Sequence, residues 1–133
     1  MKMIYKFYDT CSLIENSEHL FSETNERIVI SSISLQELEN IKVSKNKDEQ
    51  VKYTARFLLR QFLNNPTKFD IFVYKDKYEK YIKKYDLTVA NDTKIIASAY
   101  AFMNKHKRDE VYFVTNDVSC YHLAKIYFPN EKI

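Results

Sequence analysis

Four acidic residues stand where an apolar, strand-like run gives way to a predicted helix: Asp9, Glu37, Asp92 and Asp117. Residues just beyond the carboxyl ends of strands in an open α/β sheet converge on one crevice. Four carboxylates gathered there would repel one another unless a hard divalent cation lay among them, and oxygen-rich sites suit Mg²⁺ or Mn²⁺. The pattern predicts a metal-dependent enzyme acting on phosphates, in which bound cations activate a water and stabilise the leaving group.

Each acid also has a purely structural explanation. Residues 34–37, Ser-Leu-Gln-Glu, fit a capping box, in which Glu37 reaches back to the amide at the start of its helix. Asp9, Asp92 and Asp117 fall at or near predicted helix starts, where carboxylates accept hydrogen bonds from free amides. Because all four acids occur at the same kind of junction, we favour a metal site. Asp9 and Asp92 are the expected direct ligands, while Glu37 and Asp117 would bind through water or hold a second ion.

Short apolar runs alternate with helical patterns along the chain. Strands are predicted at 3–8, 27–31, 69–74 and 111–114, and helices at 10–16, from Ser34, at 51–63, at 77–84, from an Asn91 cap to 105, and at 117–127, with a loop at 17–26. This alternation indicates a three-layer α/β/α sandwich with a central parallel sheet of four or five strands. The sequence stops soon after the last predicted helix, so we expect a final edge strand to be minimal or missing.

The composition is that of one soluble domain. With 133 residues, 45% of them hydrophobic and 29% charged, residues 1–133 can bury a single core, although they could be the N-terminal part of a longer protein. No run approaches the roughly 18 apolar residues that span a bilayer, so we expect no membrane contact and a cytoplasmic location. The two cysteines do not suggest a disulfide framework or a zinc site. The absence of glycine excludes P-loop and dinucleotide-binding motifs, which need it for close approach to phosphate.

Basic residues that could bind a nucleic acid lie close in sequence to Glu37. They are Lys42, Lys45, Lys52, Arg56 and Arg60. The net charge of +3 is compatible with a polyanionic partner, and Lys94, two residues after Asp92, could reach a phosphate. Tyrosines and lysines also alternate over residues 74–85. There we favour a packing face with lysines in water over a surface that stacks bases.

Four short motifs follow one another in a definite order. They are Tyr-Asp-Thr-Cys-Ser-Leu-Ile at 8–14, Ser-Leu-Gln-Glu-Leu-Glu-Asn-Ile at 34–41, Asn-Asp-Thr-Lys-Ile-Ile-Ala-Ser-Ala at 91–99 and Val-Thr-Asn-Asp at 114–117. Each motif is weak alone, but together they resemble those of PIN-domain nucleases and span essentially the whole chain. They are closer to PIN domains of the PhoH-associated and phage-like kind than to toxins of toxin–antitoxin pairs.

This resemblance implies Mg²⁺- or Mn²⁺-dependent cleavage of single-stranded RNA or of structured nucleic acid, with the four acids as the family's acidic quartet. Thr115 matches the Thr or Ser that often precedes the last acid and would position a water or phosphate. Thr10, Asn116 and Lys94 would also position the substrate. The chain departs from the family's pattern at Cys11, where Asn is common.

Several alternatives stay open. A PIN-like domain could bind nucleic acid or a partner without cutting, or act as a toxin ribonuclease with an antitoxin partner, and a homodimer is possible. A phosphatase acting on small substrates lacks a recognisable nucleophile. The haloacid-dehalogenase pattern needs a second Asp where Cys11 stands, and a cysteine phosphatase loop needs Arg where Ser17 stands.

Overall fold

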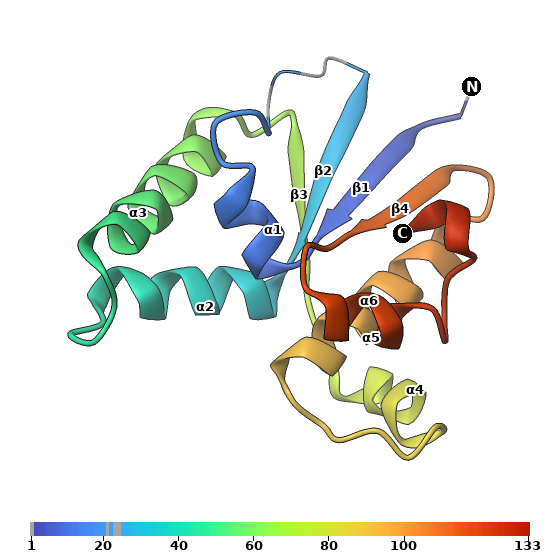
Figure 1. Cartoon of the computed structure of the whole chain (residues 1–133). Helices are drawn as coiled ribbons and strands as arrows, with labels where there is room; N and C mark the ends of the chain where they lie inside the picture. Colours follow the sequence, from blue (N-terminus) through green and yellow to red (C-terminus); the bar gives the residue numbers. More distant parts are fainter. Residues whose placement is uncertain (1, 21, 23–24) are drawn as a thin grey trace.

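A four-stranded parallel sheet lies at the centre of the computed structural model, which describes residues 2–20, 22 and 25–133 (Figure 1). The strands are β1 (Ile4–Tyr8), β2 (Glu26–Ser31), β3 (Phe69–Phe72) and β4 (Glu110–Val114), in the order β3-β2-β1-β4. Every neighbouring pair is parallel. The predicted α/β class and parallel sheet are therefore confirmed, with four strands in the described part of the chain.

Helices cover both faces of this sheet. They are α1 (Thr10–Glu15), α2 (Ser32–Val43), α3 (Glu49–Asn64), α4 (Glu79–Lys83), α5 (Asn91–Lys105) and α6 (Val118–Ala124), with short 3₁₀ turns η1 (Asp76–Tyr78) and η2 (Asn130–Lys132). In Figure 1, α1, α2 and α3 lie to one side of the sheet and α4, α5 and α6 to the other. None of the helices in the described ranges is long and apolar enough to cross a membrane.

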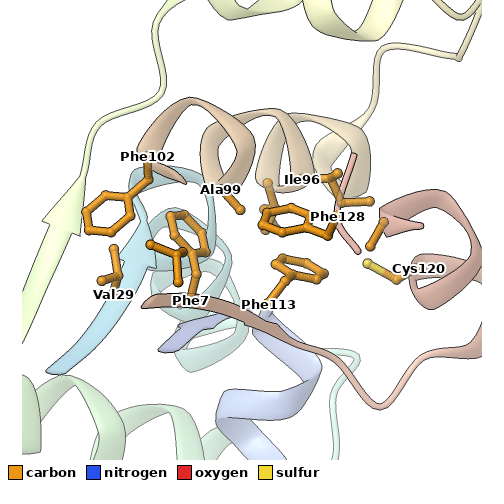
Figure 2. Close-up of a cluster of buried hydrophobic side chains, with 11 residues drawn as sticks. Phe7, Val29, Ile96, Ala99, Phe102, Phe113, Cys120 and Phe128 are labelled. Carbon is orange, nitrogen blue, oxygen red and sulfur yellow. The ribbon is translucent and has the colours of Figure 1, made fainter. Parts of the chain in front are cut away.

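The strands are apolar on both faces because both faces are covered. Alternate side chains point to opposite sides, so Phe7, Val29 and Phe113 pack in one cluster with α5 and α6 (Figure 2). Tyr8 and Ile30, one residue further along β1 and β2, belong to a second cluster with α1, α2 and α3. The two cores together fix β1 in the middle of the molecule, and its carboxyl end leads directly into Asp9.

The chain builds this fold without glycine. Parallel strands are joined by helical crossovers and need no tight hairpins, which removes the commonest demand for that residue. Among the described residues only Asp86 has a positive φ, of 56°, and Asp is one of the residues that tolerates the left-handed region.

Several predicted element starts and ends are wrong. Helix α2 begins directly after β2 because the Ser31 hydroxyl accepts a hydrogen bond from the Ile33 amide at 3.0 Å. Ser34 is therefore inside the helix, and the predicted capping box does not form. Asn91 is the first residue of α5 and not its cap, since the Ala90 amide is bound by the Thr93 hydroxyl at 2.9 Å.

Other bounds shift by a few residues. Strand β3 ends at Phe72, and the last helix ends at Ala124, where 117–127 was predicted. The predicted loop at 17–26 is described only in part, because residues 21, 23 and 24 lie outside the described residues; Glu26 already belongs to β2.

Candidate active site

Asp9 is the central acid of the site and is held from two directions. It follows β1, is only 5% exposed, and its backbone amide donates to the Val114 carbonyl of β4 at 3.1 Å. One carboxylate oxygen accepts a hydrogen bond from the Ser12 amide at 2.8 Å, which caps α1. The other oxygen accepts one from the Thr115 hydroxyl. Asp9 is thus both a helix cap and a fixed carboxylate at the carboxyl edge of the sheet.

Glu37 reaches the same region from the first turns of α2. The Thr10 hydroxyl lies 2.5 Å from a Glu37 carboxylate oxygen and 2.9 Å from the Ser34 hydroxyl. A hydroxyl has one proton, so the consistent arrangement is that Ser34 donates to Thr10, and Thr10 donates to Glu37. Thr10, predicted to position substrate, contacts an acid of the site instead. Ser34 was assigned only a capping role, although its place one turn before Glu37 puts both on the same helix face.

Asp117 and Asp92 complete the acidic set from two other elements. Asp117 follows β4 and caps α6, accepting from the amide of Ser119 at 2.8 Å. Asp92 lies in the first turn of α5, is exposed, and makes no hydrogen bond or ion pair with any described residue. Capping therefore explains part of the role of Asp9 and Asp117, but it does not explain Asp92.

The charges of the four acids act on common groups. Burial raises the pKa of Asp92, and the charges of Asp117 and Asp9 raise it further. Cys11 is exposed on the surface beside Asp9. Partial burial of its thiol raises its pKa, and all four acids, Asp9, Asp117, Asp92 and Glu37, add to that effect. A single thiol that is influenced by all four carboxylates lies among them.

In the described part of the chain, no cationic side chain pairs with these acids. Within residues 2–20, 22 and 25–133, none of the ion pairs includes Asp9, Glu37, Asp92 or Asp117. As the side chains stand, however, no three Asp, Glu, His or Cys residues of the described chain are close enough together to hold a metal ion. The donors are all carboxylate oxygens, which is the chemistry that Mg²⁺ and Mn²⁺ prefer.

The remaining predicted site residues are three substrate-positioning residues and five cations. Thr115 contacts the acids, whereas the Asn116 amide donates to Glu15 and Lys94 lies over the Tyr74 ring at 5.5 Å from its centroid. Among the predicted cations, Lys42, Arg56 and Arg60 line one groove of about 450 Å³ between α2 and α3, together with Leu59, Leu63 and Asn64. Lys45 is exposed on the connection after α2, and Lys52 pairs with Glu49 at 3.3 Å.

Comparison with known proteins identifies the family of the chain. The family model for the PIN domain matches residues 7–127. No curated protein sequence gives a significant match. Among solved structures, the crystal structure of VapBC2 from Rickettsia felis bound to a DNA fragment from their promoter is similar with a TM-score of 0.50 and 22% identity, covering 87% of this chain and 90% of that chain. The chain belongs to the PIN-domain family, whose members are generally nucleases that typically use divalent metals.

Proposed function

We propose that this protein is a Mg²⁺- or Mn²⁺-dependent ribonuclease that hydrolyses phosphodiester bonds of single-stranded or structured RNA. The observation that supports the proposal is that the charges of Asp9, Glu37, Asp92 and Asp117 all raise the pKa of Cys11, while no cationic side chain pairs with any of them in the described part of the chain. Repulsion between carboxylates favours binding of a cation among them, and oxygen ligands favour a hard cation such as Mg²⁺.

The chain's own residues would prepare the site for such an ion. Asp9 and Asp92 would bind it directly, while Glu37 and Asp117 would bind through water or hold a second ion. A divalent cation there lowers the pKa of a bound water and offsets charge that develops on the phosphate. Asp9 is already oriented by two hydrogen bonds, so it loses little entropy on binding. Asp92, which is exposed and unbonded, is the ligand free to rotate toward the ion.

Two of the predicted positioning residues, Thr115 and Thr10, contact acids of the site. Thr115 donates to Asp9 and its hydroxyl oxygen lies 3.1 Å from the Asp117 amide, so one side chain fixes the relative placement of two acids. Thr10 donates to Glu37 and so holds that one acid. These hydroxyls leave the outward carboxylate lone pairs available for an ion or for waters bound to it.

RNA would be held by the cationic groove. Glu37 and Lys42 are five residues apart on α2, about 7.5 Å along its axis, and Lys42, Arg56 and Arg60 line the groove further along this helix. Contacts of this kind bind the phosphate backbone without reading sequence. They suit a substrate whose scissile phosphate lies at the acids while its neighbours lie between α2 and α3.

The first test is cleavage of a labelled single-stranded RNA in the presence of Mn²⁺ or Mg²⁺. Wild type, Asp92→Asn and an EDTA lane run side by side, and Glu131→Gln, an exposed acid outside the site, is the matched control. We expect cleavage by wild type and Glu131→Gln only. Equal cleavage by Asp92→Asn would mean a contaminant and would remove support for the site. RNA binding without cleavage by any variant would favour a silent binding module.

A second candidate is a toxin ribonuclease with an antitoxin partner. The fold shared with VapBC2, a complex crystallised on promoter DNA, favours this role. It predicts growth arrest when the wild-type chain is expressed, rescue by the product of a neighbouring gene, and no arrest with Asp92→Asn.

A further inference from the structure

A pocket of about 290 Å³ lies on the α4 side of the molecule, away from the acids. It is lined by Lys80, Tyr81, Lys84, Tyr85, Tyr100, Ile126 and Tyr127. These residues come from α4 and the turn after it, from α5, and from the segment after α6. None of them belongs to the acidic site or to the cationic groove between α2 and α3.

Tyrosine rings form the walls of this pocket. The rings of Tyr81 and Tyr100 meet edge to face with centroids 5.0 Å apart, and Tyr85 and Tyr127 meet in the same way at 5.5 Å. The Tyr127 hydroxyl donates to the Tyr81 carbonyl, which ties the C-terminal segment to α4. Tyr85 is 44% exposed, so part of this aromatic wall is open to solvent.

The predicted packing face therefore serves two purposes. Tyr78 is 3% exposed and packs with Ile82 against α5, as a packing residue should. Tyr81 and Tyr85, at the next positions of the same stripe, turn toward the pocket. The interpretation of the stripe as a packing face holds for Tyr74, Tyr78 and Tyr81, which pack in one cluster, whereas Tyr85 is exposed.

The side chains of Lys80 and Lys84 line this pocket, and neither has an acidic partner among the described residues. Lys80 lies over the Tyr81 ring at 5.3 Å and Lys84 over the Tyr85 ring at 5.5 Å. The ion pair on this helix within the described residues joins Lys83 to Glu79, and neither Lys80 nor Lys84 has a carboxylate partner there. A tyrosine cage can hold a cation, but two lysines would repel one. The chemistry points to a ligand that is both aromatic and anionic.

We propose that this pocket is a second nucleotide-binding site, in which the tyrosines stack one base and Lys80 and Lys84 bind its phosphates. Its volume is near the lower end of small-molecule sites, which fits one nucleotide. Tyr100 is eight residues beyond Asp92 on α5, about 12 Å along the helix axis. A single strand of several nucleotides that reaches the acids can thus place another of its nucleotides here. This last step rests on the proposed function, whereas binding of the nucleotide itself does not.

The test measures binding and not cleavage, so it stands if the nuclease proposal fails. Adenosine 5′-monophosphate is titrated by NMR, and a labelled oligoadenylate by fluorescence anisotropy, both in EDTA. The variants are Tyr85→Ala, Tyr85→Phe and the pair Lys80→Ala with Lys84→Ala. Lys83→Ala is the matched control, because Lys83 is adjacent and exposed but does not line the pocket.

We expect Tyr85→Ala to weaken oligoadenylate binding by about 5- to 150-fold, the usual effect of removing one base stack, while Tyr85→Phe binds like wild type. The double lysine variant should reduce the slope of log K against log salt by about 0.7 for each phosphate that is no longer neutralised, and Lys83→Ala should change neither. If Tyr85→Ala weakens binding of the mononucleotide as much as binding of the oligoadenylate, this result also supports the pocket. Equal affinity of all variants for the oligoadenylate would overturn the proposal. It would also be overturned if Lys83→Ala lost as much affinity as the pocket variants, or if only an acidic, tyrosine-containing peptide displaced the oligoadenylate.

Discussion

The repulsion between Asp92 and Asp117 can be measured as a coupling energy whose sign depends on metal. The perturbation is a double-mutant cycle of Asp92→Asn and Asp117→Asn. Asp92 makes no hydrogen bond or ion pair with a described residue, and Asn is as good a helix cap as the Asp at 117. Each single change therefore removes charge and leaves the local structure nearly intact. Any benefit that Asp92 draws from the α5 dipole cancels in the cycle.

The sign follows from the titration of Asp92. Burial and the charges of Asp117 and Asp9 raise its pKa in the folded protein above the ordinary value. The folded state then holds the proton more tightly than the unfolded state, so ionisation costs stability, and that cost grows as pH rises from the unfolded to the folded pKa. At neutral pH it is fully present. Asp92→Asn should therefore raise stability more when Asp117 is intact than when it has been replaced.

The expected size is modest because Asp92 is exposed. Coupling between exposed charges measured by such cycles is about 0.2–1 kcal/mol, and for a domain of 133 residues this corresponds to about 1–5 °C in Tm. At 1 M salt the screening length falls to about 3 Å, so the coupling should largely disappear.

The assay is thermal unfolding by circular dichroism at pH 7 in EDTA and low salt, then in Mn²⁺. With Mn²⁺ at 100 times its Kd, wild type should gain about 2.7 kcal/mol, and either single variant much less, so the coupling becomes favourable. A favourable coupling in EDTA would refute the reasoning, because the two acids would then not repel. An unchanged sign in Mn²⁺ would refute a shared ion.

Three further predictions concern single residues. Alkylation of Cys11 should be slow at pH 7 in EDTA, since its pKa is raised by burial and by the four acids, and faster in Mn²⁺; buried Cys120, with a pKa of about 12, should stay unmodified in mass spectra in both, and a Cys11 rate indifferent to metal would contradict the geometry. Thr115→Val should cost about 1–3 kcal/mol in urea unfolding because Asp9 loses a hydrogen bond, whereas Thr115→Ser should not; equal losses would mean that packing and not the hydroxyl matters. Phe113→Ala should cost about 3–5 kcal/mol, since the ring is fully buried, and a loss below about 1 kcal/mol would place it outside the core.

The sheet was predictable because its strands are short apolar runs buried on both faces. Runs such as Phe7-Tyr8 in β1 and Ile28-Val29-Ile30 in β2 pack into the hydrophobic cores on the two sides of the sheet. The junction after β2 was harder, since residues 31, 32 and 34 are all serines that can cap. The pairing of Tyr8 with Ile30 decides it, because this register puts Ser31 at the end of the strand.

The places of Asp9 and Asp117, beyond the carboxyl ends of β1 and β4, were predictable from topology, but the detailed partners of the acids were not. The strand-like run predicted before Asp92 forms no strand in the described part of the chain, and Glu37 lies inside α2. That Thr10 would bind Glu37 depends on how α1 packs beside α2. That Lys94 lies over the Tyr74 ring depends on the path of the β3–α4 connection, which brings this ring within reach. The tyrosine pocket needs Tyr127 beside Tyr85, a contact between segments that no local pattern encodes.

The hydrogen bond between Thr115 and Asp9 joins residues 106 positions apart, and β1 pairs with β4 over the same span. Chains are made from the N-terminus, and contacts between distant segments form late. During synthesis Asp9 therefore lacks Asp92, Thr115 and Asp117 until these later residues have been made. The acidic site of the proposed nuclease therefore forms only after residues 110–117 have been made and β4 has closed the sheet.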